Sequence, residues 1–236
     1  MKKLIDLALA LAATAVCSVA SAGVVTFEGY DPSVYEAGYQ FSNGFDKFTV
    51  LGLPGGFSGA IVQGSDASSC IIVVCPMGNP SRYFAGLNDG GLSFMRTDMS
   101  ILLSSLDFGF VLPVDGLVGV SVGQLQITGT DSLGATTQIA KNFSGQNAAG
   151  KFEFSRWDIG GTFAQTRFTQ VAFNACLYLL DGSCSFDNNI TQNQAQFAID
   201  NIAFDNIASV PEPASMALVG VSLFGMFAAG RRRKSV

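Results

Sequence analysis

Carboxylates and cysteines are the side chains of this 236-residue chain that could do chemistry, because histidine is absent. Without histidine, neither a Ser-His-Asp nor a Cys-His nucleophile can form, and no imidazole can bind zinc. Glycoside hydrolysis needs only two carboxylates, and Asp107 and Asp115, in or beside a predicted strand, are the candidates. No neighbouring residue marks either one as an acid with a raised pKa. The sequence therefore favours a protein without enzymatic activity. A carboxylate-based glycoside hydrolase ranks third among the hypotheses for its function.

The charge of the chain limits its partners. It has 13 Lys and Arg against 18 Asp and Glu, a net charge of −5. Six basic residues and one acidic residue lie in the two ends of the chain, so residues 23–213 keep 7 basic and 17 acidic side chains, a net charge of −10. Nucleic-acid affinity comes mainly from clustered Lys and Arg, so we expect no nucleic-acid partner. The carboxylates suit a hard cation such as calcium.

The first 22 residues have the pattern of a secretory signal peptide. Lys2 and Lys3 precede an apolar stretch from Leu7 to Val19, and the small residues Ala20-Ser21-Ala22 follow it. This order predicts a signal helix outside the folded domain, with signal peptidase cutting after Ala22.

Residues 210–236 form a second terminal signal. Pro211, Glu212 and Pro213 precede the uncharged, mostly apolar residues 214–230, and a basic cluster follows, made of Arg231, Arg232, Arg233 and Lys234. A helix over residues 214–230 would be about 25 Å long, enough for a short transmembrane helix. The basic cluster should stay on the cytoplasmic side. An ordinary single-pass tail anchor would have the same helix and charges.

The order Pro-Glu-Pro, short apolar helix and arginine cluster resembles the PEP-CTERM sorting signal of Gram-negative bacteria. The resemblance covers residues 211–236. It implies that an exosortase reads Pro211, Glu212 and Pro213 and cleaves near them. Anchoring in the inner membrane would then be transient, and the protein would reach the cell surface or the extracellular matrix.

Four cysteines remain after the signal peptide, namely Cys70, Cys75, Cys176 and Cys184. Export places them in an oxidising compartment, and their even number predicts two disulfides. We expect Cys70–Cys75 and Cys176–Cys184, because each pair brackets a short segment with turn residues. A zinc site made of the four thiolates is the alternative.

Short strands separated by turns dominate residues 23–209. Strand patterns with apolar alternation or short apolar runs, separated by Gly, Pro, Asn and Asp clusters, occur at 24–27, 47–53, 71–74, 101–110, 117–128, 136–143, 151–154, 167–173 and 196–204. About nine to twelve strands without a long helix predict an all-β fold, a single β-sandwich or jelly-roll domain.

Three segments of this domain look like the first, central and last strands of jelly rolls related to galactose-binding and carbohydrate-binding modules. They are Val25–Gly29, Ile101–Phe108 and Gln196–Ile202. Such modules often hold a structural calcium between an early Phe-Glu and a late Asp. The resemblance implies Glu28 and Asp200 as calcium ligands. Without a metal, Glu28 would end a strand and Asp200 would bond to loop amides.

Aromatic side chains are the candidate contacts for a sugar, because ring faces combine apolar area with directional contacts. Trp157, the only tryptophan, and Tyr83 are the residues we predict to bind a ligand, with core packing as the alternative. The first hypothesis for function is a non-catalytic surface or matrix protein that associates with exopolysaccharide. The second is a structural or adhesive surface protein without glycan specificity.

Overall fold

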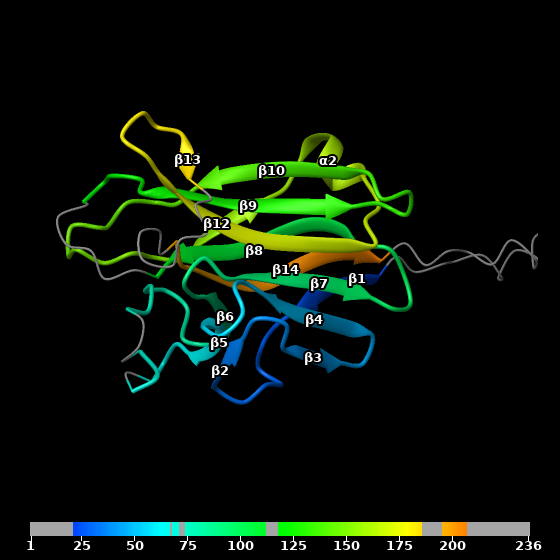
Figure 1. Ribbon diagram of the computed structural model, residues 1–236, viewed down its shortest axis with the longest axis horizontal. Coiled ribbons are helices and arrows are strands. Elements are labelled where there is room, and N and C mark those ends of the chain that lie inside the picture. Colours follow the sequence, from blue (N-terminus) through cyan, green and yellow to red (C-terminus); the bar gives the residue numbers. More distant parts are fainter. Residues whose placement is uncertain (1–20, 67, 71–73, 112–117, 186–194, 207–236) are drawn as a thin grey trace, which may run out of the picture. The chain divides into compact units, whose positions relative to one another are not determined.

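The computed structural model describes residues 21–66, 68–70, 74–111, 118–185 and 195–206, and Ser21–Ile207 form one compact unit. These described residues form two antiparallel sheets and one short helix, α2 (Gly161–Gln165). The all-β prediction is therefore confirmed, and the architecture is a β-sandwich (Figure 1). The predicted signal helix and transmembrane helix lie outside the described residues. Within those residues, no helix is long and apolar enough to cross a membrane.

Sheet A runs in the order β11 (Ser155–Asp158), β8 (Leu102–Phe110), β14 (Phe197–Asn206), β6 (Arg82–Gly86), β5 (Phe57–Gln63) and β2 (Ser33–Glu36), and β1 (Ser21–Val25) also pairs with β14. Sheet B runs in the order β10 (Thr136–Asn142), β9 (Gly123–Thr130), β12 (Gln170–Tyr178), β7 (Gly91–Arg96), β4 (Asp46–Leu51) and β3 (Gln40–Asn43), and β13 (Cys184–Ser185) also pairs with β12.

The core between the sheets is built from alternate residues of their strands, as the period of a half-buried strand requires. Phenylalanine rings link the two layers: Phe48 stacks on Phe94 at 5.2 Å within sheet B, and Phe94 lies 5.7 Å from Phe204 of sheet A. Phe27, which follows β1, packs against both Phe48 and Phe84. Most phenylalanines of the sequence are therefore core residues of the sandwich.

Sheet A carries a further apolar cluster on its outer face. Its buried members are Ala60, Val62, Tyr83, Ala85, Leu87, Val111 and Ala198. Cys70, Cys75 and Phe154 pack against this cluster, and Met77 forms a parallel bridge with Glu153 beside it. The segment between β5 and β6 thus covers the outer face of sheet A, which explains why β5 is buried on both sides.

The domain begins slightly earlier than the sequence predicts. Ser21 and Ala22, which we assigned to the signal peptide, pair with Asn206 and Asp205 as the first two residues of β1. The predicted cut after Ala22 therefore falls within β1, and three paired residues, Gly23 to Val25, would remain on the exported side.

Candidate functional site

The two predicted calcium ligands lie on either side of the start of β6. Glu28 follows β1, and its Oε1 accepts a hydrogen bond of 2.9 Å from the backbone N–H of Arg82. Asp200, on β14, is fully buried, and its Oδ2 accepts hydrogen bonds from Asn79 Nδ2 at 2.8 Å and Ser81 Oγ at 2.7 Å. The two carboxylates predicted from the sequence therefore contact the same short segment, residues 79–82.

The surroundings of these carboxylates are mainly hydrogen-bond donors. The Arg82 guanidinium donates to the backbone carbonyls of Glu28 and Tyr30, at 3.1 and 2.6 Å. The Oδ1 of Asp200 is buried and has no hydrogen-bond partner among the described residues. The described residues contain no cluster of three or more Asp, Glu, Cys or His side chains that could hold a metal ion. Calcium at Glu28 and Asp200 therefore stays a prediction.

Asp200 lies at an irregular point of β14. The pairing with β8 shifts between Asp200 and Ala203, and Asn201 adopts a left-handed conformation with φ of 49°. The Asn201 side chain donates a 2.8 Å hydrogen bond to Asp107 Oδ2, and Asp107 lies opposite Asp200 on β8. Burial raises the pKa of Asp200, the hydrogen bonds from Asn79 and Ser81 lower it less, and the charge of Asp107 raises it further.

Trp157 and Tyr83 do not present the free ring faces that a sugar would need. Tyr83 is fully buried on the outer face of sheet A and meets the edge of Phe154 at 5.2 Å. Trp157 retains 8% exposure and packs 5.8 Å from Phe108. Core packing, the alternative interpretation, describes both residues, and our prediction of direct ligand contact disagrees with their burial. Both rings have a large apolar area, and burying that area stabilises the fold.

A group of three partly or largely exposed aromatic rings lies at the edge formed by β2 and β3. Tyr35 stacks on Tyr39 at 4.6 Å and on Phe41 at 5.6 Å, so the three rings close the sandwich between the edge strands of the two sheets. Tyr39 keeps 49% of its surface exposed. Their closeness in sequence was the only signal that could have identified this group.

Both predicted disulfides are confirmed, so the four thiolates are not available for the alternative zinc site. Cys70 and Cys75 have Cα atoms 5.4 Å apart and close the loop that covers sheet A. Cys176 and Cys184 have Cα atoms 5.5 Å apart and tie β13 to β12 in sheet B.

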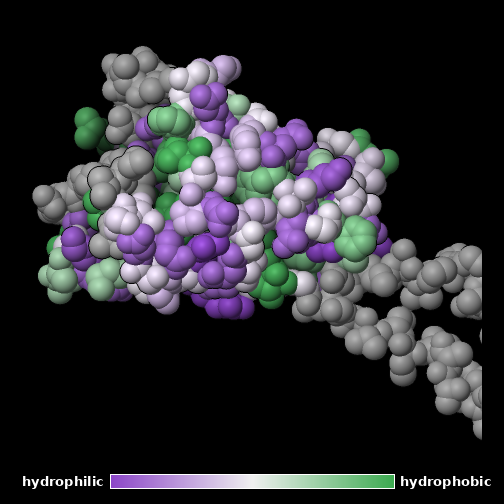
Figure 2. All heavy atoms as spheres, turned by 90° about the horizontal axis from the view of Figure 1, so that it is seen from below, coloured by the Kyte–Doolittle hydropathy of each residue, from purple (hydrophilic) through white to green (hydrophobic). Residues whose placement is uncertain are grey.

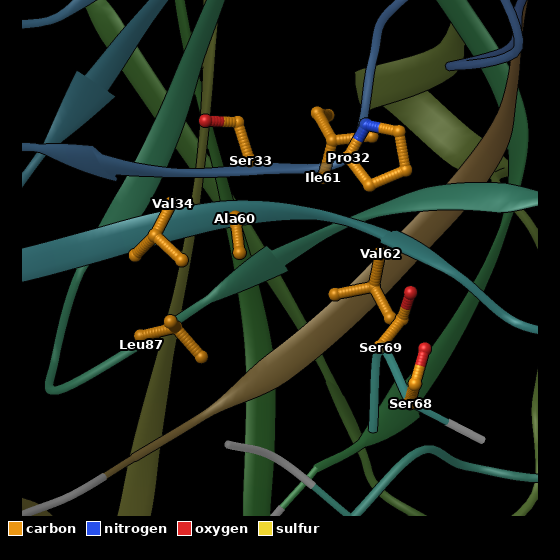
Figure 3. Close-up of a pocket in the computed structure, with 9 residues that line it drawn as sticks. All are labelled: Pro32, Ser33, Val34, Ala60, Ile61, Val62, Ser68, Ser69 and Leu87. Carbon is orange, nitrogen blue, oxygen red and sulfur yellow. The ribbon is translucent and has the colours of Figure 1, made fainter. Parts of the chain in front are cut away.

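A small apolar pocket lies on the outer face of sheet A, beside Ser68 and Ser69. Its volume is about 180 Å³. Figure 3 shows Val34, Ala60 and Leu87 grouped on one side and Val62 near Ser69 on the other. The lining contains no charged side chain, and its only polar side chains are serine hydroxyls, so the pocket offers little to orient a polar ligand.

The outer face of sheet B is different, because mainly polar, uncharged side chains form two rows across six of its strands. The register of the strands places one row across β3, β4, β7, β12, β9 and β10, and a second row lies beside it. The first row is Ser42, Lys47, Met95, Gln170, Thr130 and Thr136, and the second is Gln40, Thr49, Ser93, Ala172, Thr128 and Gln138. We call these twelve positions the polar rows.

The polar rows face away from the core, because the residues between them on β4, β7 and β12, namely Phe48, Phe94 and Val171, belong to the core. Hydrogen bonds hold several of the amides in place. Gln170 Nε2 donates to Ser93 Oγ at 2.7 Å, and Gln138 Nε2 donates to Gln126 Oε1 at 2.6 Å. Among the described residues, no hydrogen bond is accepted by the Oε1 atoms of Gln170 and Gln138; the Gln138 side chain is exposed and that of Gln170 is partly exposed.

A hollow of about 430 Å³ opens at the β3 end of the polar rows. Its lining residues are Gln40, Phe41, Ser42, Lys47, Phe48, Thr49 and Met95. The view from the edge where β2 and β3 lie shows hydrophilic residues across the middle and hydrophobic residues in small groups (Figure 2). The hollow is therefore lined by polar and apolar residues in about equal measure.

Comparison with known proteins identifies one motif. Residues 209–234 match the PEP-CTERM protein-sorting motif, which confirms the resemblance of the C-terminal segment and marks the chain as a sorted, exported protein. No curated protein matches the chain. Among solved structures, a mutant of CBM29-2, a family 29 carbohydrate-binding module, matches with 13% identity and a TM-score of 0.32, over 78% of this chain and 91% of that chain. A likeness this low does not transfer a binding site.

Proposed function

We propose that this protein is a non-catalytic exported component of the cell surface or extracellular matrix, and that its sandwich associates with exopolysaccharide. The observation that carries the proposal is the pair of polar rows on sheet B. Amide and hydroxyl groups both donate and accept hydrogen bonds, as sugar hydroxyls do. Six strands about 4.8 Å apart give a surface about 24 Å wide, which can contact several sugar units of one chain.

The composition of the polar rows is unlike that of a protein interface. Cores of protein interfaces are enriched in aromatic residues, Met and Arg. The polar rows contain no aromatic residue, and Met95 is their only large apolar side chain. On sheet A, Cys70, Cys75 and Phe154 pack against the outer face. Sheet B is therefore the face that we assign to the polysaccharide.

The sorting signal supports the proposed route. We infer that an exosortase recognises Pro211, Glu212 and Pro213, after signal peptidase has removed the N-terminal signal. The helix 214–230 would hold the chain in the inner membrane until that cleavage, and the cluster Arg231, Arg232 and Arg233 would keep its end in the cytoplasm. These residues lie outside the described part of the chain.

The hydrolase alternative is less well supported. Asp107 accepts a hydrogen bond from Asn201, and the carboxylate opposite it, Asp200, is fully buried and could not serve Asp107 as a catalytic partner. Asp115 lies outside the described residues. Turnover of chromogenic glycosides that is lost in Asp107→Asn and Asp115→Asn variants would revive this alternative.

Binding of the full-length chain to polysaccharides tests the proposal. Wild-type protein should bind native matrix polysaccharide in a pull-down, and Gln138→Ala and Gln170→Ala should each weaken binding about two- to tenfold, as the loss of one hydrogen bond predicts. Gln165→Ala, on the exposed surface of α2, is the matched control and should bind normally.

A calcium chelator in the same pull-down tests the predicted structural ion at Glu28 and Asp200. Weaker binding in the chelator would support that ion. Absence of wild-type binding to every polysaccharide would leave the second hypothesis, an adhesive protein without glycan specificity.

A further inference from the structure

Lys47 is the only charged side chain among the twelve positions of the polar rows. It lies on β4, exposed, between Ser42 of β3 and Met95 of β7. A positive charge on this face contrasts with the net charge of residues 23–213, which is −10. It also lines the hollow of about 430 Å³ beside Gln40 and Thr49.

The positive charge of Lys47 is not neutralised by a neighbouring carboxylate. No salt bridge among the described residues involves Lys47. Asp46, its neighbour in sequence, pairs with Arg96 at 2.7 Å, and Asp98 also pairs with Arg96 at 3.0 Å. The nearby acidic residues are thus engaged with another cation, and the Lys47 ammonium is free to bind an anion from outside.

We propose that the hollow around Lys47 is a subsite for a sugar that carries a carboxylate, such as a uronic acid, within an otherwise uncharged glycan. This inference rests on the proposed function. The Lys47 ammonium would bind the carboxylate, and the side chains of Gln40, Ser42 and Thr49 would bind the hydroxyls of the same sugar.

The width of the polar rows also predicts how far apart the carboxylates of the glycan lie. The polar rows are about 24 Å wide and offer one cation, so they match a polymer with about one carboxylate over that length. A polymer with a carboxylate on every sugar would place several unpaired anions over uncharged side chains of an acidic domain, and net repulsion would oppose its binding. The partner is therefore a sparsely charged heteropolysaccharide.

The test compares gellan, whose glucuronates are widely spaced, with carboxyl-reduced gellan as its uncharged counterpart. The full-length chain should bind gellan more tightly, and added salt should remove the difference. Lys47→Gln should weaken gellan binding about two- to fivefold, the usual contribution of an exposed ion pair, without changing binding to the reduced polymer. Lys47→Glu should weaken gellan binding further. Lys151→Gln, which changes an exposed lysine in a turn, is the control and should bind as wild type does.

Each outcome decides between the two proposals. If wild type and Lys47→Gln bind gellan equally, or if Lys151→Gln has the same effect as Lys47→Gln, the subsite is wrong and the proposed function stands. Equal binding of gellan and its reduced form by wild type would also overturn the subsite alone. If wild type binds neither polymer nor native matrix polysaccharide, both proposals fail.

Discussion

Asp200 shows how one buried carboxylate can be held without a counter-charge. Asn79 and Ser81 donate to its Oδ2, and its Oδ1 has no hydrogen-bond partner. Burial raises its pKa above the ordinary value of 3.8, because the charged form loses hydration that two neutral donors only partly replace. Asp107, opposite on β8, is the acidic group that faces it.

This burial predicts a pH-dependent effect of Asp200→Asn. An acid whose pKa is higher in the folded state contributes stability that is fully present below its unfolded pKa and is lost as pH rises through the folded pKa. As pH rises from about 4 to 8, the free energy of unfolding of the Asp200→Asn variant should therefore increase relative to that of the wild-type protein. Urea denaturation of the full-length chain at several pH values measures this difference.

Asp205→Asn, an exposed change on the same strand, provides the comparison for that series. A difference between wild type and Asp200→Asn that stays constant over the pH range would show that Asp200 does not titrate differently on folding.

At the scale of elements, the two disulfides stabilise different parts of the sandwich. The Cys70–Cys75 disulfide closes the covering loop of sheet A, and the Cys176–Cys184 disulfide joins β12 to β13. Both loops are short, so each disulfide should contribute about 2 to 3 kcal/mol through the entropy of the unfolded chain. Replacing each pair by alanine should lower the free energy of unfolding by about that amount. The Cys176 pair should cost more, because Cys176 is fully buried and Cys70 is not.

Equilibrium unfolding of the two double variants under non-reducing conditions gives these values. A larger loss for the Cys70 pair than for the Cys176 pair would contradict the packing argument.

Strand β5 depends on a glycine that leaves space for an aromatic ring. A Cβ on Gly59 would lie 2.7 Å from the Phe84 ring and 3.0 Å from Val50, so Gly59→Ala should destabilise the domain by about 1 to 3 kcal/mol. Gly56→Ala adds a methyl group to open space in the preceding turn and serves as the control. Thermal unfolding of both variants measures the effect. Equal melting temperatures for the two variants would show that Phe84 can move away at little cost.

Gly59 also explains why the sequence did not indicate this strand. The segment 57–63 is rich in small residues, and strands β6 and β7 contain glycines as well, so none of the three has the alternation expected of a half-buried strand. Both faces of β5 are in fact buried, and its small residues fit beneath phenylalanines from neighbouring strands. Strands β8 and β14 were predicted because their large apolar residues mark the core face directly.

At the scale of the whole molecule, the sorting motif predicts a processing event that the domain itself does not need. Replacing Pro211, Glu212 and Pro213 by alanine should leave an unprocessed form in the membrane fraction. Two prolines would keep the backbone extended outside a membrane helix, and a protease requires an extended chain. Cell fractionation with mass measurement distinguishes the forms. Normal processing of the alanine variant, with the wild-type mass in the extracellular fraction, would count against recognition by an exosortase.

Export, the all-β class and the disulfide pairing could be predicted from the sequence, because each depends on residues close together in the chain. The terminal signals are contiguous, the strand patterns are local, and each cysteine pair spans a short loop. The surroundings of Glu28 and Asp200 could be predicted only in part, since their donors come from residues 79–82.

The tertiary structure alone decided which aromatic residues are buried and which polar residues share a face. The sequence left two roles open for Trp157 and Tyr83, ligand contact and core packing. Packing against Phe108 and Phe154 buries both rings. The polar rows combine residues as distant as Gln40 and Gln170, which lie on one face because the registers of six strands align them. Register between distant strands depends on packing across the whole sandwich, which no local pattern in the chain encodes.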